Sequence, residues 1–285
     1  MIFATFVAVF VLLWALFAAV LPRLLRALHK VGNRGASMSM RYGIVQRAVR
    51  HASKFRDYLP VAIIVLAGAL ITAWAGDQFL DLAERVHTKS TALQQLDARV
   101  HDWAVSERNI GATTFFVTMS RIGGPSGVAA IAAVVTVALL IARRFRWAAF
   151  LVINVAGAGA LDWELKRYFA RARPDVALML RRAAGYSFPS GHAMESTVLF
   201  MALSYLAIRS FPRWRWKSAA IALGTTLIVA VAISRVYLGV HWISDVAAGI
   251  VIGLLWTTTT TVAYETLRRI RAIRTQGLGR ESQGK

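Results

Sequence analysis

Three short blocks of polar residues interrupt this largely apolar chain, and their residue types suit phosphate chemistry. Together they supply three cations, two imidazoles and a carboxylate. Ionisable residues are rare in apolar sequence of this kind and tend to be functional where they occur. The blocks are Lys166 with Arg173-Pro174, the run Pro189-Ser190-Gly191-His192, and Ser234-Arg235 with His241 and Asp245.

The cations and the second block together predict a pocket for an oxyanion. Lys166, Arg173 and Arg235 supply positive charge, and the planar fork of an arginine matches two phosphate oxygens at once. Pro189 followed by Ser190 is typical of a helix start, where a serine can cap the helix and free N–H groups can bind an anion. These features suit the charge that develops during phosphoryl transfer.

The two histidines differ in their neighbours, and this predicts different roles. His241 and Asp245 are four residues apart, so on a helix they share a face and can touch. A carboxylate on one imidazole nitrogen frees the other nitrogen to attack. His192 has only Glu195 close by in sequence, so it is the better candidate for a general acid. Taken alone, each histidine is equally well explained as a hydrogen-bonded packing residue, and Arg235 as an anchor at a helix end.

The combination of the three blocks resembles the full signature of the type-2 phosphatidic acid phosphatase superfamily, which also contains vanadium-dependent haloperoxidases and soluble acid phosphatases. The resemblance extends over about 59–263 and leaves 1–57 unexplained. It implies that His241 forms a phosphohistidine, that Asp245 orients it, and that His192 protonates the leaving group. The residues that it implies for phosphate binding are Lys166, Arg173, Ser190, Gly191 and Arg235.

The elements that must position these blocks are membrane helices. The chain is 57% hydrophobic, against about 45–50% in soluble domains, and seven apolar runs approach or reach the roughly 17–25 residues that cross a bilayer. We therefore expect an all-α polytopic bundle, in which one N-terminal span precedes the six-helix phosphatase core that the resemblance implies. The runs are Ile2–Leu21, Leu59–Ala75, Gly127–Ala142, Trp147–Leu161, Ala193–Ile208, Ser218–Ile233 and Trp242–Ala263.

Several connecting segments also carry predictions. The second span is expected to end at Asp77, and the apolar residues of 77–109 recur at helical spacing among polar ones. This pattern predicts an amphipathic helix that lies on the outer membrane surface or caps the bundle, with His87 and His101 solvated on its surface. A chain break is expected at 123–125. The predicted parts are an N-terminal helix with a basic loop (1–57), the phosphatase core (58–265) and a basic tail (266–285).

The distribution of positive charge predicts the orientation. The formal net charge is +20, which by itself would also suit nucleic-acid binding. However, 22 of the 34 Lys and Arg fall on alternate connections, as expected of cytoplasmic loops. The N-terminus is then outside, the C-terminus inside, and all three blocks face the periplasm or exterior of a bacterial inner membrane. We therefore expect the bilayer and a lipid phosphate as partners, and no nucleic acid.

The expected activity is metal-independent removal of phosphate from a lipid phosphate or diphosphate. The implied substrate range includes phosphatidic acid, phosphatidylglycerophosphate, undecaprenyl diphosphate and lipid A phosphate. We expect no cofactor and no metal site, because three cations already supply positive charge and the chain holds no cysteine. The alternative is a lipid phosphotransferase with the same intermediate. An anion transporter is disfavoured because the middles of the spans hold no ionisable residues.

Overall fold

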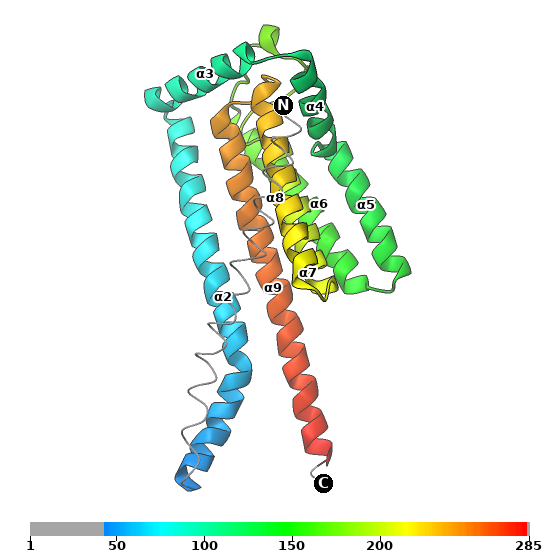
Figure 1. The fold of residues 1–285 in the computed structure, drawn as a ribbon. Helices are drawn as coiled ribbons and strands as arrows, with labels where there is room; N and C mark the ends of the chain where they lie inside the picture. The colour runs from blue at the N-terminus through cyan, green and yellow to red at the C-terminus, as the bar shows by residue number, and fades with distance from the viewer. Residues whose placement is uncertain (1–42, 284–285) are drawn as a thin grey trace.

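The computed structural model describes residues 43–283, and this part of the chain contains helices and loops but no strand. The long helices run side by side, and α3 lies across one end of the bundle (Figure 1). The predicted all-α fold is therefore confirmed. The elements are α2 (Gly43–His87), α3 (Thr91–Ser106), α4 (Ile110–Ile122), α5 (Pro125–Ile141), α6 (Phe145–Phe169), the 3₁₀ turn η1 (Val176–Leu178), α7 (Gly191–Ser210), α8 (Trp214–Tyr237) and α9 (Ile243–Gln283).

Four of the described helices are long and apolar enough to cross a membrane, namely α6, α8 and parts of α2 and α9. The pair α4–α5, bent by 53°, would be a fifth span. The shorter α7 does not meet this test, and more than half of its residues are buried. The predicted first span, Ile2–Leu21, lies outside the described residues, so the total of seven stays a prediction.

Helix α7 packs against α5, α6, α8 and α9, so the start of α7 is enclosed by its neighbours. Its buried residues Leu199, Phe200 and Leu206 form one apolar cluster with Leu151 of α6 and Val231 of α8. Close packing of this kind holds helices together in lipid, where apolar burial gives little net drive. The second and third polar blocks therefore stand on a packed scaffold.

The second span is predicted to end at Asp77, but helix α2 itself continues beyond this residue to His87. The extra turns are held by aromatic packing: the ring of Phe79 lies 6.3 Å from that of Phe169 and 6.1 Å from that of Phe188. The amphipathic helix that caps the bundle is instead α3. At the other end of the chain, α9 runs unbroken to Gln283, so the predicted boundary at 265 is not a break in the helix.

The break predicted at 123–125 is present. Helix α4 ends at Ile122, and α5 begins with Pro125 at its first turn, where the missing N–H of proline costs nothing. The bend brings the backbone of Gly124 to the end of the bundle that also holds the three polar blocks.

Candidate active site

The three polar blocks meet around one cavity of about 440 Å³. They come from the end of α6, the start of α7, the end of α8 and the turn before α9, which lie at the end of the bundle covered by α3 (Figure 1). Of the eight predicted site residues, Lys166, Arg173, Gly191, His192, Arg235 and His241 line the cavity. Ser190 and Asp245 are fully buried and do not line it.

His241 and Asp245 are in contact, although not on one helix as the spacing suggested. His241 lies in the turn before α9, and Asp245 lies in the first turn of α9. The Nδ1 atom of His241 is 3.5 Å from Oδ2 of Asp245, which also accepts the Trp242 N–H at 3.0 Å. The imidazole is 2% exposed. Burial first, and then the nearby cations Arg235, Arg173 and Lys166, hold the pKa of His241 well below its usual value, which favours the neutral ring that a nucleophile needs.

Arg173 connects the cavity wall to His241. Its Nη1 lies 3.1 Å from Nε2 of His241 and donates to the carbonyl of Val240 at 2.8 Å. Its other nitrogens donate to the carbonyls of Ala184 and Gly185 at 3.1 and 3.0 Å. The loop that precedes α7 therefore places this guanidinium beside the nitrogen that would attack phosphorus.

Lys166 is paired with a carboxylate that the sequence analysis did not single out. Its Nζ lies 2.6 Å from Oδ2 of Asp162, one helical turn earlier on α6. Both groups lie close to Gly191 at the start of α7. A Cβ atom added to this glycine would lie only 2.7 Å from Lys166 Nζ and 2.7 Å from Asp162 Oδ2. A glycine at this position therefore lets the lysine approach the first N–H groups of α7, where an anion can bind.

Arg235 is held by the bent α4–α5 pair. Its Nη1 donates a hydrogen bond to Ser120 Oγ of α4, and the arginine is 5% exposed. A buried guanidinium with few protein partners retains donors for a ligand. Within the described residues, its Nε has no hydrogen-bond partner.

His192 lies on the cavity wall, next to the backbone of Gly124. A Cβ added to Gly124 would lie 2.9 Å from its Nε2, so the ring packs against the α4–α5 break. Ser190 caps α7 in position only, because its side chain makes no capping bond. Its N–H is already bonded to the carbonyl of Asp245 at 2.9 Å. Ser190 thus joins α7 to α9, and the amides left for an anion are those that follow it.

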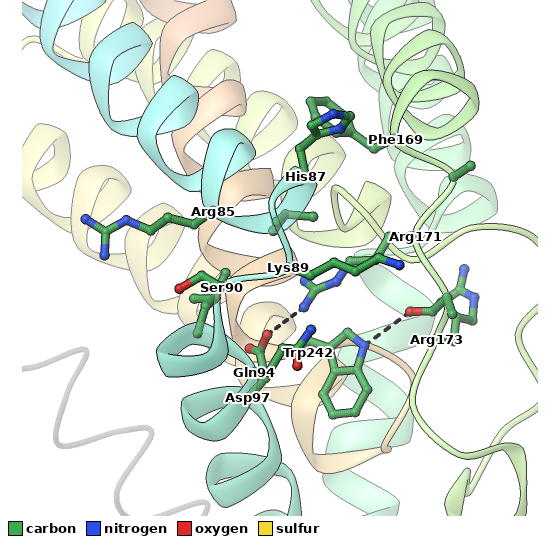
Figure 2. A pocket seen from close by; sticks show the side chains of 14 residues that line it. Arg85, His87, Lys89, Ser90, Gln94, Asp97, Phe169, Arg171, Arg173 and Trp242 are labelled. Carbon is green, nitrogen blue, oxygen red and sulfur yellow. Dashed lines mark hydrogen bonds and ion pairs between the residues drawn. The ribbon is translucent and has the colours of Figure 1, made fainter.

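A second cavity of about 700 Å³ lies under α3, and Figure 2 shows its side chains. It is separated from the first cavity by the segment 170–173, and Arg173 lines both. Arg171 extends from this segment toward Asp97 of α3 (Figure 2), with 2.7 Å between Nη2 and Oδ2. The prediction that His101 is solvated is wrong: it is 5% exposed and its ring lies 5.6 Å from that of Trp242. Burial lowers the pKa of His101.

Sequence reasoning missed four polar residues that support the site: Asp97, Ser120, Asp162 and Arg171. Asp162 could have been found, because a carboxylate one turn before a lysine within an apolar helix is a recognisable pair. Asp97 and Arg171 are 74 residues apart, and no local spacing signals their contact. Three exposed arginines at the cavity mouth were also missed; they are Arg121, Arg181 and Arg182.

Comparison with known proteins agrees with this arrangement. The sequence profile of the PAP2 superfamily matches residues 147–269, which include all three blocks. Phosphatidylglycerophosphatase B of Bacillus subtilis is 30% identical over 62% of this chain and 86% of its own length. An undecaprenyl-diphosphatase of Sulfolobus acidocaldarius is 34% identical over 49% of this chain and 66% of its own.

A solved structure is also similar. It is the crystal structure described as the first transmembrane PAP2 type phosphatidylglycerolphosphate phosphatase from Bacillus subtilis. It aligns with a TM-score of 0.64 and 26% identity, over 68% of this chain and 96% of that one. Sequence, fold and the apolar helices lead to one conclusion: this chain is an integral membrane phosphatase and belongs to the PAP2 superfamily.

Proposed function

We propose that the chain hydrolyses a lipid phosphate or diphosphate at the outer face of the membrane, through a phosphohistidine on His241. The observation that carries this proposal is the environment of that imidazole. Its Nε2 lies 3.1 Å from Arg173 at the cavity wall, and its Nδ1 faces Asp245 at 3.5 Å. This environment supports a role for Nε2 in attack and for Nδ1 as the nitrogen that Asp245 orients.

In the first step, the scissile phosphate enters the cavity and Arg173 shifts from Nε2 of His241 to a phosphate oxygen. Lys166, Arg235 and the first free amides of α7 hold the other oxygens. His241 Nε2 then bonds to phosphorus as the bond to the lipid oxygen breaks. His192, protonated once the negative phosphate is bound beside it, gives this proton to that oxygen and becomes neutral.

In the second step, water attacks the phosphohistidine. His192, now neutral, accepts a proton from the water as the new phosphorus–oxygen bond forms. The bond from phosphorus to His241 breaks and inorganic phosphate leaves. The two histidines are thereby restored, and no electron acceptor or donor is needed.

We also propose that the reaction needs no metal ion. The cavity walls carry Lys166, Arg173 and Arg235 against one carboxylate, that of Asp162. Among the described residues, no three His, Asp or Glu side chains lie together as a metal site would require. Positive charge from side chains can stabilise a phosphoryl transition state.

The choice of a lipid substrate rests on the relatives. The names of the matched proteins cover a phosphatidylglycerophosphatase, an undecaprenyl-diphosphatase and a lipid A 1-phosphatase. The cavity lies at one end of the bundle of apolar helices, and in a bilayer this end would lie near the surface, where the phosphate of a lipid lies. The outer leaflet is proposed because the distribution of Lys and Arg predicts that the cavity faces outward.

The test is phosphate release from a panel of these lipids in detergent, with excess EDTA and no added acceptor. Release at the same rate with and without EDTA, and inhibition by vanadate, is the expected result. Release that requires an added alcohol acceptor would instead indicate a phosphotransferase. Activity lost in EDTA and restored by magnesium would contradict the metal-independent reaction.

The orientation of the chain in the membrane can be tested separately. Because the chain holds no native cysteine, single introduced cysteines can be labelled from one side of the membrane. Ser90→Cys lies at the α3 end of the bundle and Arg280→Cys lies near the end of α9. In intact cells, an impermeant thiol reagent should label the first variant and not the second. The reverse pattern would place the cavity on the cytoplasmic side.

A further inference from the structure

A buried chain of charges runs from the capping helix α3 to the proposed nucleophile. Arg171, in the segment between α6 and α7, bridges two carboxylates: its Nη2 lies 2.7 Å from Asp97 Oδ2 and its Nη1 lies 2.6 Å from Asp245 Oδ1. The aspartates are 2% and 0% exposed at their side chains, and the arginine 15%. Asp245 in turn faces His241. Figure 2 shows Arg171 and marks its contact with Asp97.

We propose that Arg171 and Asp97 are positioning residues for the nucleophile and act through Asp245. This inference rests on the proposed role of His241. Neither residue lines the catalytic cavity, so neither touches the scissile phosphate. Their contribution is to fix the carboxylate that orients the imidazole.

The hydrogen bonds of Asp245 show how the orientation is fixed. Arg171 occupies Oδ1, and the Trp242 N–H occupies Oδ2 at 3.0 Å. With both oxygens bonded, the carboxylate plane cannot rotate, and Oδ2 stays toward His241 Nδ1. A carboxylate buried without a cation would be strongly destabilised in its charged form. Arg171 thus supplies both the direction and the neutralising charge.

Asp97 fixes the other side of the same guanidinium. Its two oxygens accept the Ser244 N–H at 3.0 Å and the Ser244 hydroxyl at 2.7 Å, besides the arginine. Ser244 lies next to Asp245 in the first turn of α9. The capping helix is therefore tied to the turn that carries the nucleophile, and a shift of α3 would move Arg171 and Asp245 together.

A matched control lies in the same second cavity. Arg85 also pairs with an aspartate, Asp81, at 3.0 Å, but these side chains are 57% and 55% exposed. Arg85→Gln therefore removes the same charge from the wall of the same cavity without touching Asp245. Its activity should stay within twofold of wild type.

The experiment measures kcat and KM on a soluble aryl phosphate for Arg171→Gln, Arg171→Lys, Asp97→Asn and Arg85→Gln. Misplacement of a reacting group by about 1 Å costs about 10²-fold, so Arg171→Gln should lower kcat by about that factor with little change in KM. Arg171→Lys keeps the positive charge but lacks the planar guanidinium that reaches both aspartates. Its kcat should therefore lie between those of wild type and Arg171→Gln. Asp97→Asn should lower kcat about tenfold.

A double-mutant cycle separates positioning from general stability. In an Asp245→Asn background, Arg171→Gln should lower kcat less than threefold further, because the residue through which it acts is already impaired. A full additional loss in that background, a change confined to KM, or wild-type kcat in Arg171→Gln would each overturn the proposal. If Arg171→Gln does not fold, as judged by gel filtration in detergent, the proposal is tested with Arg171→Lys and Asp97→Asn, and the same criteria apply to their kcat values.

Labelling of each folded variant, quenched in denaturant and analysed at alkaline pH, distinguishes this proposal from the proposed function. If wild type traps no labelled phosphate on histidine, the phosphohistidine reaction itself is wrong. If wild type traps label and Arg171→Gln forms it at the wild-type rate, only the positioning role is wrong.

Discussion

The inner wall of the catalytic cavity and its mouth are built in different ways. On the inner wall, His241, Asp245 and Arg235 are 2%, 0% and 5% exposed, and each has protein partners. At the mouth, Arg121, Arg181 and Arg182 are exposed, and none forms an ion pair within residues 43–283. The inner geometry is fixed before substrate arrives, as electrostatic catalysis requires. The mouth is left free to adapt, which suits attraction of an anionic headgroup.

The largest effect should follow from removing the proposed nucleophile, His241, at the inner wall. His241→Ala leaves no imidazole beside Arg173 and Asp245, so turnover should fall below detection on every substrate. Phosphate release by the purified variant is the measurement. His87→Ala, which removes an exposed histidine from the second cavity, is the control and should keep wild-type activity. Residual turnover within 100-fold of wild type in His241→Ala would show that another group attacks.

The next largest effect should come from Asp245, which lies beside His241, the proposed nucleophile. Asp245→Asn keeps the shape of the side chain but removes its negative charge and replaces one acceptor oxygen with an NH₂ donor. Both changes affect its contacts with His241 Nδ1, the Trp242 N–H and Arg171. By comparison with the orienting aspartate of a serine protease triad, kcat should fall by about 10⁴-fold. Steady-state kinetics with the variant at matched detergent concentration will measure this. A loss below tenfold would mean that His241 is oriented without its carboxylate.

An intermediate effect, dependent on the substrate, is expected for His192. His192→Ala removes the proposed acid, and a leaving group of low pKa needs little protonation. The variant should lose much less activity on an aryl phosphate than on a lipid alkyl phosphate. The ratio of kcat/KM values for the two substrates is the measurement. Equal losses on both would indicate that His192 holds the phosphate instead of protonating the leaving oxygen.

The smallest effect should come from the mouth. Exposed charge pairs contribute about 0.2–1 kcal/mol each, so the double variant Arg181→Gln/Arg182→Gln should raise KM for a lipid substrate about fivefold. Its kcat should stay near wild type, and the change in KM should shrink at high salt. A large fall in kcat would mean that the arginines at the mouth take part in the reaction. The mouth would then not differ from the inner wall in the way described above.

The contrast also explains what the sequence could predict. The helices were predictable because apolar runs have a simple length rule, and the three blocks because their residue types suit one chemistry. The end of α2 could not be predicted, because packing of Phe79 on Phe169 extends the helix through polar sequence. The contact between Asp97 and Arg171 could not be predicted either, because it depends on how α3 crosses the bundle. Burial of His101 has the same cause.

The most direct test of the central claim is trapping of the covalent intermediate. Purified protein is mixed with a lipid substrate labelled in its phosphate, quenched in denaturant, and separated at alkaline pH, where phosphohistidine survives. Wild type should carry label on the peptide that contains His241, and His192→Ala should still do so with an aryl phosphate. His241→Ala should carry none. Label retained in His241→Ala and lost in His192→Ala would exchange the two roles and contradict this account.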